Sequence, residues 1–196
     1  MTLEEKYNEL CSTPSDINEH LPTLKKYAEE CKHITEMGTR GIVSTYALLM
    51  GKPKKLISYD ICDIEVNEVT SLSNQNEIEF QFICADTCNV TIEETDLLFI
   101  DTEHNYLQLK TELIKHGGKA KKYLIFHDTV SYGHRDSNAY GHYINLKTID
   151  TDDNTKQGLI PAIEEFVNNN PNWVVHETFT NNNGLIVLKN NTSTSL

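Results

Sequence analysis

Short apolar runs alternate with segments of helical character along the middle of this chain, and this alternation constrains the fold more than any other feature. Apolar runs of strand length occur at five places: residues 33–36, 56–60, 78–84, 97–101 and 123–127. Helical segments are predicted between most of them, at residues 42–50, 66–72 and 106–116. Strands that alternate with helices are typical of a parallel sheet with helices on both faces.

The two ends of the chain depart from this alternation. Residues 4–11 and 16–31 are predicted to form two helices ahead of the first strand. Near the other end, a helix over 158–168 precedes two β-rich runs, 173–179 and 185–189. An Asn/Gly-rich turn joins these runs, which indicates an antiparallel hairpin.

We therefore expect one α/β domain of seven strands in which the last strand is reversed. A length of 196 residues is natural for a single domain over residues 1–196. The core is expected at 33–189, and residues 190–196 are predicted to form a frayed tail.

Charge and cysteine content exclude several classes of protein. A net charge of −12 lacks the basic surplus that phosphate contacts require, so a nucleic-acid partner is not expected. The chain has no signal-like apolar segment and no run of roughly 20 apolar residues that could span a bilayer. Five cysteines without CxxC spacing indicate reduced thiols. A soluble, cytoplasmic protein is expected.

The first strand leads into the loop Glu36-Met-Gly-Thr-Arg-Gly41, which has the character of a nucleoside-binding turn. Gly38 and Gly41 let the backbone turn tightly beneath a ligand. Asp60 ends the next strand about 20 residues later, where a carboxylate can accept from ribose hydroxyls. Asp86, after the third strand, could accept from an adenine amino group. Glu36 at the loop would repel phosphate and suit an ammonium or sulfonium group.

Other interpretations of this loop stay open. NAD- and FAD-binding domains share the glycines and the later acidic residue, although the full GxGxxG pattern is absent here. Glu36 and Asp86 could also be solvated carboxylates at strand ends.

A second group of polar residues follows the fourth and fifth strands. Asp101 and His104 come at the end of one apolar strand, and His127 and Asp128 end the next. The carboxyl edge of an open α/β sheet is where ligands bind. A histidine there can act as a general base, and a divalent cation can lower the pKa of a hydroxyl. Alternatively, Asp101 caps the following helix, His104 is an exposed turn residue and His127 donates to a backbone carbonyl.

The succession ITEMGTRG, LISYDI, FICADT, TDLLFIDTEHNY and YLIFHDT resembles class I S-adenosylmethionine-dependent methyltransferases. Within these it is most similar to cephalosporin-hydroxylase-like and macrolide or sugar O-methyltransferases. The resemblance covers residues 33–189, including the terminal NNNGLIVL. It implies a Rossmann-like sheet of order 3-2-1-4-5-7-6 and the cofactor S-adenosylmethionine. It also implies which residues bind the cofactor. Asp60 would bind the ribose and Asp86 the adenine. The methionine part would be bound by Glu36, Gly38, Thr39 and Gly41.

The same resemblance implies roles at the second group. In the metal-dependent members, an aspartate binds the metal and a histidine three residues later is the base, which corresponds to Asp101 and His104. An acidic pair follows the next strand in those families; Asp128 matches it, whereas His127 replaces a carboxylate. The metal site implied in this way consists of Asp101, His127 and Asp128, and its metal is Mg²⁺ or Mn²⁺. Because Mg²⁺ prefers oxygen ligands, the imidazole favours Mn²⁺, or a site without metal, over Mg²⁺.

The function expected from the sequence is methyl transfer to a hydroxyl of a sugar, glycan or other small molecule. The polar insert at 129–157, with residues such as His134, Arg135, Tyr140 and His142, is a candidate lid over the acceptor. The N-terminal helices could cover the cofactor or form a homodimer contact. The competing hypotheses are an NAD-dependent oxidoreductase and a non-catalytic nucleoside-binding scaffold.

Overall fold

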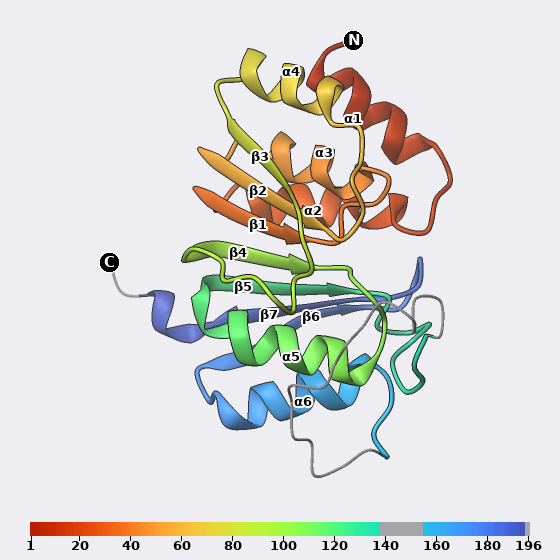
Figure 1. The fold of residues 1–196 in the computed structure, drawn as a ribbon, viewed down its shortest axis with the longest axis vertical. Helices are drawn as coiled ribbons and strands as arrows, with labels where there is room; N and C mark the ends of the chain where they lie inside the picture. The colour runs from red at the N-terminus through yellow and green to blue at the C-terminus, as the bar shows by residue number, and fades with distance from the viewer. Residues whose placement is uncertain (138–154, 195–196) are drawn as a thin grey trace.

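One seven-stranded sheet runs through the computed structural model, which describes residues 1–137 and 155–194 (Figure 1). Its strand order is β3-β2-β1-β4-β5-β7-β6. Strands β1 to β5 pair in parallel, and β7 runs antiparallel to both β5 and β6. The predicted order and the reversed last strand are confirmed. The strands are β1 His33–Met37, β2 Lys55–Asp60, β3 Glu79–Cys84, β4 Thr95–Ile100, β5 Ala120–His127, β6 Trp173–Phe179 and β7 Leu185–Asn190.

Helices cover both faces of the sheet, as the alternation predicts. Among the described residues, four helices pack on one face and two on the other, and each set shares an apolar core with the sheet (Figure 1). The first set is α1 Leu3–Ser12, α2 Leu21–Ala28, α3 Val43–Met50 and α4 Asn67–Gln75, and the second is α5 Tyr106–His116 and α6 Leu159–Asn169. Short 3₁₀ turns lie at Asn18–His20, Gly117–Lys119 and Asn191–Thr194. None of the helices in the described part of the chain is long and apolar enough to cross a membrane.

The central strands are buried on both faces, which explains why their sequences are apolar without alternation. Leu97, Leu98 and Phe99 of β4 are each 0% exposed. Burying such a side chain contributes roughly 1.5–3 kcal/mol. This packing fixes the ends of β1, β4 and β5, so the polar residues that follow them start from rigid positions.

One predicted segment differs from the structure, and a second lies only partly within the described residues. The helix predicted over 16–31 is wrong in its first part, where a 3₁₀ turn precedes α2. Pro22 is the cause, because its ring is tolerated in the first turn of a helix and not in the interior. In the tail predicted over residues 190–196, the described part contains the 3₁₀ turn Asn191–Thr194, while residues 195–196 lie outside the described residues and fraying stays a prediction. The first residue of this turn is tied down, since the Asn191 amide donates to the Asn172 carbonyl at 2.9 Å.

Candidate functional site

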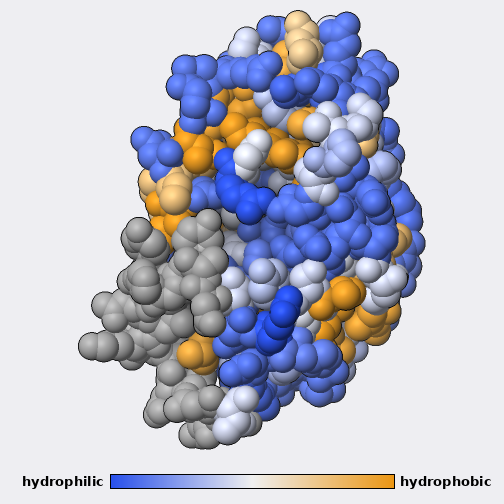
Figure 2. Space-filling model, turned by 90° about the vertical axis from the view of Figure 1, so that its right-hand side faces the viewer, coloured by the Kyte–Doolittle hydropathy of each residue, from blue (hydrophilic) through white to orange (hydrophobic). Residues whose placement is uncertain are grey.

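A cavity of ≈ 250 Å³ opens at the carboxyl ends of the parallel strands. The loops after β1, β2, β3 and β4 line it, together with Asp128 after β5. Asp16 and Ile17, between α1 and α2, form a further part of the wall. The connection between the two N-terminal helices therefore borders the cavity, whereas a cofactor cover or a homodimer contact made by the helices themselves stays a prediction. Figure 2 views this end of the molecule and shows an apolar area bordered by hydrophilic side chains.

The loop after β1 forms the floor of the cavity and contains two glycines, Gly38 and Gly41, whose surroundings differ. Gly38 has φ +87°, and a Cβ on it would overlap the backbone carbonyl of Asp101. Gly41 has no such neighbour, since a Cβ there would meet only Val43 Cγ2 at 3.7 Å. Packing therefore requires glycine at position 38. At position 41 the open space belongs to the cavity.

Asp60 holds this loop in place as well as facing the cavity. One oxygen of its carboxylate accepts from the amides of Thr39 at 2.9 Å and Arg40 at 2.7 Å. The other accepts from the amide of Cys62 at 2.8 Å. A carboxylate has about four acceptor positions, so one is left for a ligand hydroxyl. Asp60 thus lies where the sequence places it, with a structural task that the sequence did not indicate.

Asp86 also reaches the cavity from the expected strand end. Its carboxylate accepts from the Cys88 amide at 2.8 Å and from Asn89 Nδ2 at 2.6 Å. These contacts fix the turn after β3 and leave acceptor positions unused. A donor such as an exocyclic amino group could bond to them.

Glu36 lies beneath the cavity and does not line it. Its carboxylate is 0% exposed and accepts hydrogen bonds from three hydroxyls, Ser44 Oγ at 2.6 Å, Thr45 Oγ1 at 2.8 Å and Ser58 Oγ at 2.5 Å. Glu36 therefore neither faces a ligand in the cavity nor lies in solvent at the strand end, which were the two roles considered for it. Burial raises the pKa of Glu36 and the hydroxyls lower it, and the net result is a pKa of about 7.

This buried glutamate predicts that stability falls as pH rises. The pKa of Glu36 is about 7 in the folded chain against 4.5 for an ordinary glutamate, so the folded state holds the proton more tightly. The stabilisation is complete below pH 4.5 and is lost as pH rises through 7. The free energy of unfolding measured with urea should be lower at pH 8 than at pH 5. In Glu36→Gln this difference between the two pH values should be smaller by roughly 1–3 kcal/mol. An equal loss in both proteins would contradict the prediction.

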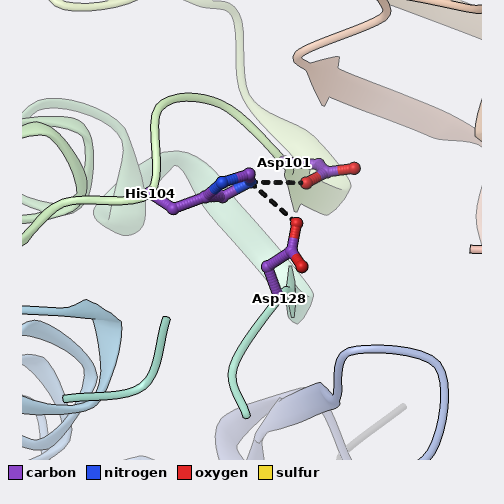
Figure 3. Close-up of side chains that lie close together, drawn as sticks. All are labelled: Asp101, His104 and Asp128. Atoms are coloured by element: carbon purple, nitrogen blue, oxygen red, sulfur yellow. Dashed lines mark hydrogen bonds and ion pairs between the residues drawn. The ribbon is translucent and has the colours of Figure 1, made fainter. Parts of the chain in front are cut away.

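Four side chains converge at the edge of the cavity beyond β4 and β5. His104 Nε2 lies 3.2 Å from Asp101 Oδ1 and 2.9 Å from Asp128 Oδ2 (Figure 3). His127 Nδ1 lies 3.4 Å from the same two oxygens. Carboxylates and imidazoles thus alternate around a small square. The predicted meeting of these strand ends is confirmed.

The alternative roles for these residues have different outcomes. Asp101 does not cap the following helix, because the Asn105 side chain accepts from the Gln108 amide at 2.8 Å and is the cap. His104 is not an exposed turn residue, since its side chain is only 23% exposed. His127 does contact a backbone carbonyl, that of Asn182, through Nε2 at 3.1 Å.

Mutual pairing controls the charges of this group. Burial alone would lower the pKa of His104, but hydrogen bonds and charge from Asp101 and Asp128 outweigh it and raise that pKa to about 9. The same competition raises the pKa of His127 to about 10. Burial would raise the pKa of each carboxylate, yet the imidazoles hold both below the ordinary value. In this state the positive and negative charges balance.

Three of the four residues could also hold a cation. Ligand atoms of Asp101, His104 and Asp128 lie within 4.8 Å of one another. Two carboxylate oxygens and an imidazole nitrogen fit a borderline cation such as Mn²⁺ better than Mg²⁺. This set differs from the predicted one by containing His104 in place of His127, whose Nε2 already faces a carbonyl.

The turn between β6 and β7 connects this group with the N-terminal segment. While the Asn182 carbonyl contacts His127, its side chain accepts from the Glu19 amide at 3.1 Å and donates to the Ser15 carbonyl at 2.9 Å. His20 Nε2 contacts the carbonyl of Asn181 at 3.0 Å. The sequence marked this Asn-rich stretch only as a hairpin turn, because its partners are far away in the chain.

The polar insert contributes one residue that the sequence did not single out for the chemical group. The ring of Tyr132 stacks on the imidazole of His104. His134 and Arg135 are exposed, and Tyr140 and His142 lie outside the described residues. The acceptor-lid prediction therefore stays a prediction.

Comparison with solved structures identifies the fold. An O-methyltransferase from Bacillus cereus in complex with S-adenosylhomocysteine matches with a TM-score of 0.60 and 15% identity, over 96% of this chain and 90% of that one. The N-methyltransferase NodS from Bradyrhizobium japonicum WM9, in complex with S-adenosylhomocysteine, matches with a TM-score of 0.57 and 11% identity, over 97% and 99%. A ribosomal protein L11 methylase from Lactobacillus delbrueckii subsp. bulgaricus gives 0.54 and 13%, over 88% and 79%.

These likenesses establish that the chain has the Rossmann-like fold of class I methyltransferases. No protein-family model and no curated protein matches the sequence. The three similar structures are an O-methyltransferase, an N-methyltransferase and a ribosomal protein methylase, so the fold alone does not specify which acceptor is methylated.

Proposed function

We propose that this protein is an S-adenosylmethionine-dependent O-methyltransferase. The observation that carries the proposal is the charge of the cavity. Six carboxylates line it, Asp16, Asp60, Asp86, Asp101, Glu103 and Asp128. The one guanidinium among the described lining residues, that of Arg40, is paired with Asp16. The imidazoles of His104 and His127 balance Asp101 and Asp128, so the excess of negative charge lies at the other end of the cavity, at Asp60 and Asp86. Such a cavity attracts the ammonium and sulfonium groups of this cofactor and repels a pyrophosphate.

Similar structures support the same cofactor. Two of them, the Bacillus cereus and Bradyrhizobium japonicum proteins, are complexes with S-adenosylhomocysteine. In this chain the free acceptor positions of Asp60 and Asp86 suit the ribose hydroxyls and the adenine amino group. The remaining end of the cavity, at Asp101 and His104, would then receive the methyl group.

The chemistry proposed for that end is an in-line displacement. The acceptor oxygen bonds to the methyl carbon, the carbon–sulfur bond breaks and its electron pair stays on sulfur. The hydroxyl proton passes to His104 Nε2, and Asp101 and Asp128 orient the imidazole and stabilise its positive charge. Because these carboxylates raise the pKa of His104 to about 9, the imidazole must first release the proton on Nε2 to solvent, and only then can that nitrogen accept the hydroxyl proton.

A divalent cation has a place in this proposal. The carboxylates of Asp101 and Asp128 would hold it, and it would supply positive charge that lowers the pKa of the acceptor hydroxyl. Dialysis against EDTA should lower turnover at least tenfold, and added Mg²⁺ or Mn²⁺ should restore it. Activity that survives EDTA without loss would remove the cation from the proposal.

Calorimetry tests the cofactor directly. S-adenosylhomocysteine should bind with a measurable affinity, and NADH should not, because its pyrophosphate would meet the carboxylates around the cavity. Binding of NADH alone would favour an oxidoreductase. If neither ligand binds while a stable partner complex exists, a non-catalytic scaffold becomes the better explanation.

A sugar or glycan hydroxyl is the acceptor that we propose. Support comes from the resemblance of the sequence to sugar O-methyltransferases and from the polar composition of the insert after β5. A screen of sugars, macrolides and catechols with a labelled methyl donor tests it. Labelling of catechols alone would overturn this part.

A further inference from the structure

The imidazole of His104 is held by a second kind of contact besides its carboxylate partners. The ring of Tyr132 lies against it, with centroids 4.8 Å apart and 15° between the planes. The carboxylates of Asp101 and Asp128 both contact the same atom, Nε2. Contacts at one nitrogen fix the position of that atom and leave the ring plane free to tilt about it. A stacked ring restricts this tilt.

Tyr132 is itself placed by backbone contacts on both sides. Its amide donates to the carbonyl of Asp128 at 2.9 Å, and its own carbonyl accepts from the Leu159 amide at 3.0 Å. One turn of chain thus delivers both Asp128 and the ring that covers His104. Gly133 keeps this turn tight, because a Cβ there would overlap the Thr129 carbonyl.

A third side chain adds to the stack. The guanidinium carbon of Arg135 lies 5.4 Å from the centroid of the Tyr132 ring, within the range of a cation–π contact. Arg135 Nε donates to the carbonyl of Ser131 at 2.8 Å, which holds the guanidinium near the ring. Tyr132 is therefore constrained by its backbone and by its ring.

Packing is the alternative explanation for Tyr132. The side chain is part-buried and also packs against the apolar core formed with α5 and α6. A flat ring serves both packing and stacking, whereas an aliphatic side chain of similar bulk serves packing alone. The two explanations therefore predict different results for phenylalanine and leucine at this position.

We propose that Tyr132 is a positioning residue that sets the plane of the His104 imidazole for proton transfer. The proposal rests on the proposed function for its catalytic consequence, although the stack itself can be measured without activity. Its physical basis is that a misdirected catalytic group loses rate even when its chemistry is intact.

Two variants test the proposal, Tyr132→Phe and Tyr132→Leu. Tyr132→Phe should keep turnover within about threefold of the wild type. Tyr132→Leu should lower kcat by roughly 10–100-fold, with the KM for S-adenosylmethionine and the affinity for S-adenosylhomocysteine unchanged. In nuclear magnetic resonance spectra, the ring-current shift of the His104 ring protons should persist in Tyr132→Phe and disappear in Tyr132→Leu.

Several outcomes would overturn it. Wild-type kcat in Tyr132→Leu would do so, as would equal losses in both variants, which would implicate the hydroxyl. If Tyr132→Leu fails to fold, Tyr132→Met provides the same comparison with a more adaptable apolar side chain. Should the wild type show no methyl transfer, the proposed function fails separately, and the His104 ring-proton shifts still decide whether Tyr132 orients the imidazole.

Discussion

Replacing His104 with alanine should lower turnover by roughly 10²–10⁴-fold and leave the affinity for S-adenosylhomocysteine near that of the wild type. This expectation follows from the position of His104 at the edge of the cavity. Its Nε2 lies 2.9 Å from Asp128 Oδ2 and 3.2 Å from Asp101 Oδ1. A hydroxyl is a poor nucleophile until its proton is removed, and no other imidazole among the described residues lines the cavity. Initial-rate kinetics and calorimetry together measure the two quantities.

Two controls make this result interpretable. His176→Ala removes an exposed imidazole on β6 and should change neither quantity. Binding of Mn²⁺ to His104→Ala separates the two chemical roles, because an imidazole that ligates a cation cannot also take the proton. If His104→Ala binds Mn²⁺ as tightly as the wild type, the result supports His104 as the general base. If the variant loses its affinity for Mn²⁺, His104 is a metal ligand instead. Full turnover in His104→Ala would end the base assignment.

Gly38→Ala should destabilise the fold by roughly 2–5 kcal/mol. The residue has φ +87°, which costs about 1–2 kcal/mol for a side chain other than glycine. The added methyl would also overlap the Asp101 carbonyl, so the end of β4 must shift. Denaturant unfolding measures the loss. Because β4 leads to Asp101, any folded fraction should also have a displaced chemical group.

Gly41→Ala is the matched comparison within the same loop. Its new methyl has no neighbour closer than Val43 Cγ2 at 3.7 Å, so the free energy of unfolding should change by less than about 0.5 kcal/mol. The methyl would project into space that the ligand needs, and the affinity for S-adenosylhomocysteine should fall. A stable variant with full affinity would show that the ligand does not approach Gly41.

The sequence predicts this fold well because its signals are local. Each buried strand is a short apolar run, and the polar residue that ends it must lie at the carboxyl edge of the sheet. The meeting of Asp101 with Asp128 follows from that rule alone. The residues at which helices begin and end are predicted less well. The helix predicted from residue 16 begins only at Leu21, after a 3₁₀ turn.

What the sequence could not provide is contact between distant segments. Glu36 looked available to a ligand because its three hydroxyl partners lie on β2 and α3, eight to 22 residues away. The stack of Tyr132 on His104 depends on a loop whose path no periodicity specifies. The contact of His127 with the β6–β7 turn spans 55 residues. Each of these contacts requires the assembled sheet.

The bond between Glu19 and Asn182 has a consequence for biosynthesis. It joins residues 163 positions apart, and the neighbouring Asp16 and Ile17 form part of the cavity wall. The β6–β7 hairpin is synthesised long after Glu19, so until it emerges the amino-terminal wall lacks this bond and is held by earlier contacts such as the Arg40–Asp16 pair. The growing chain can collapse around its early strands, but a nascent polypeptide should complete the wall of its ligand chamber only after this hairpin has emerged from the ribosome.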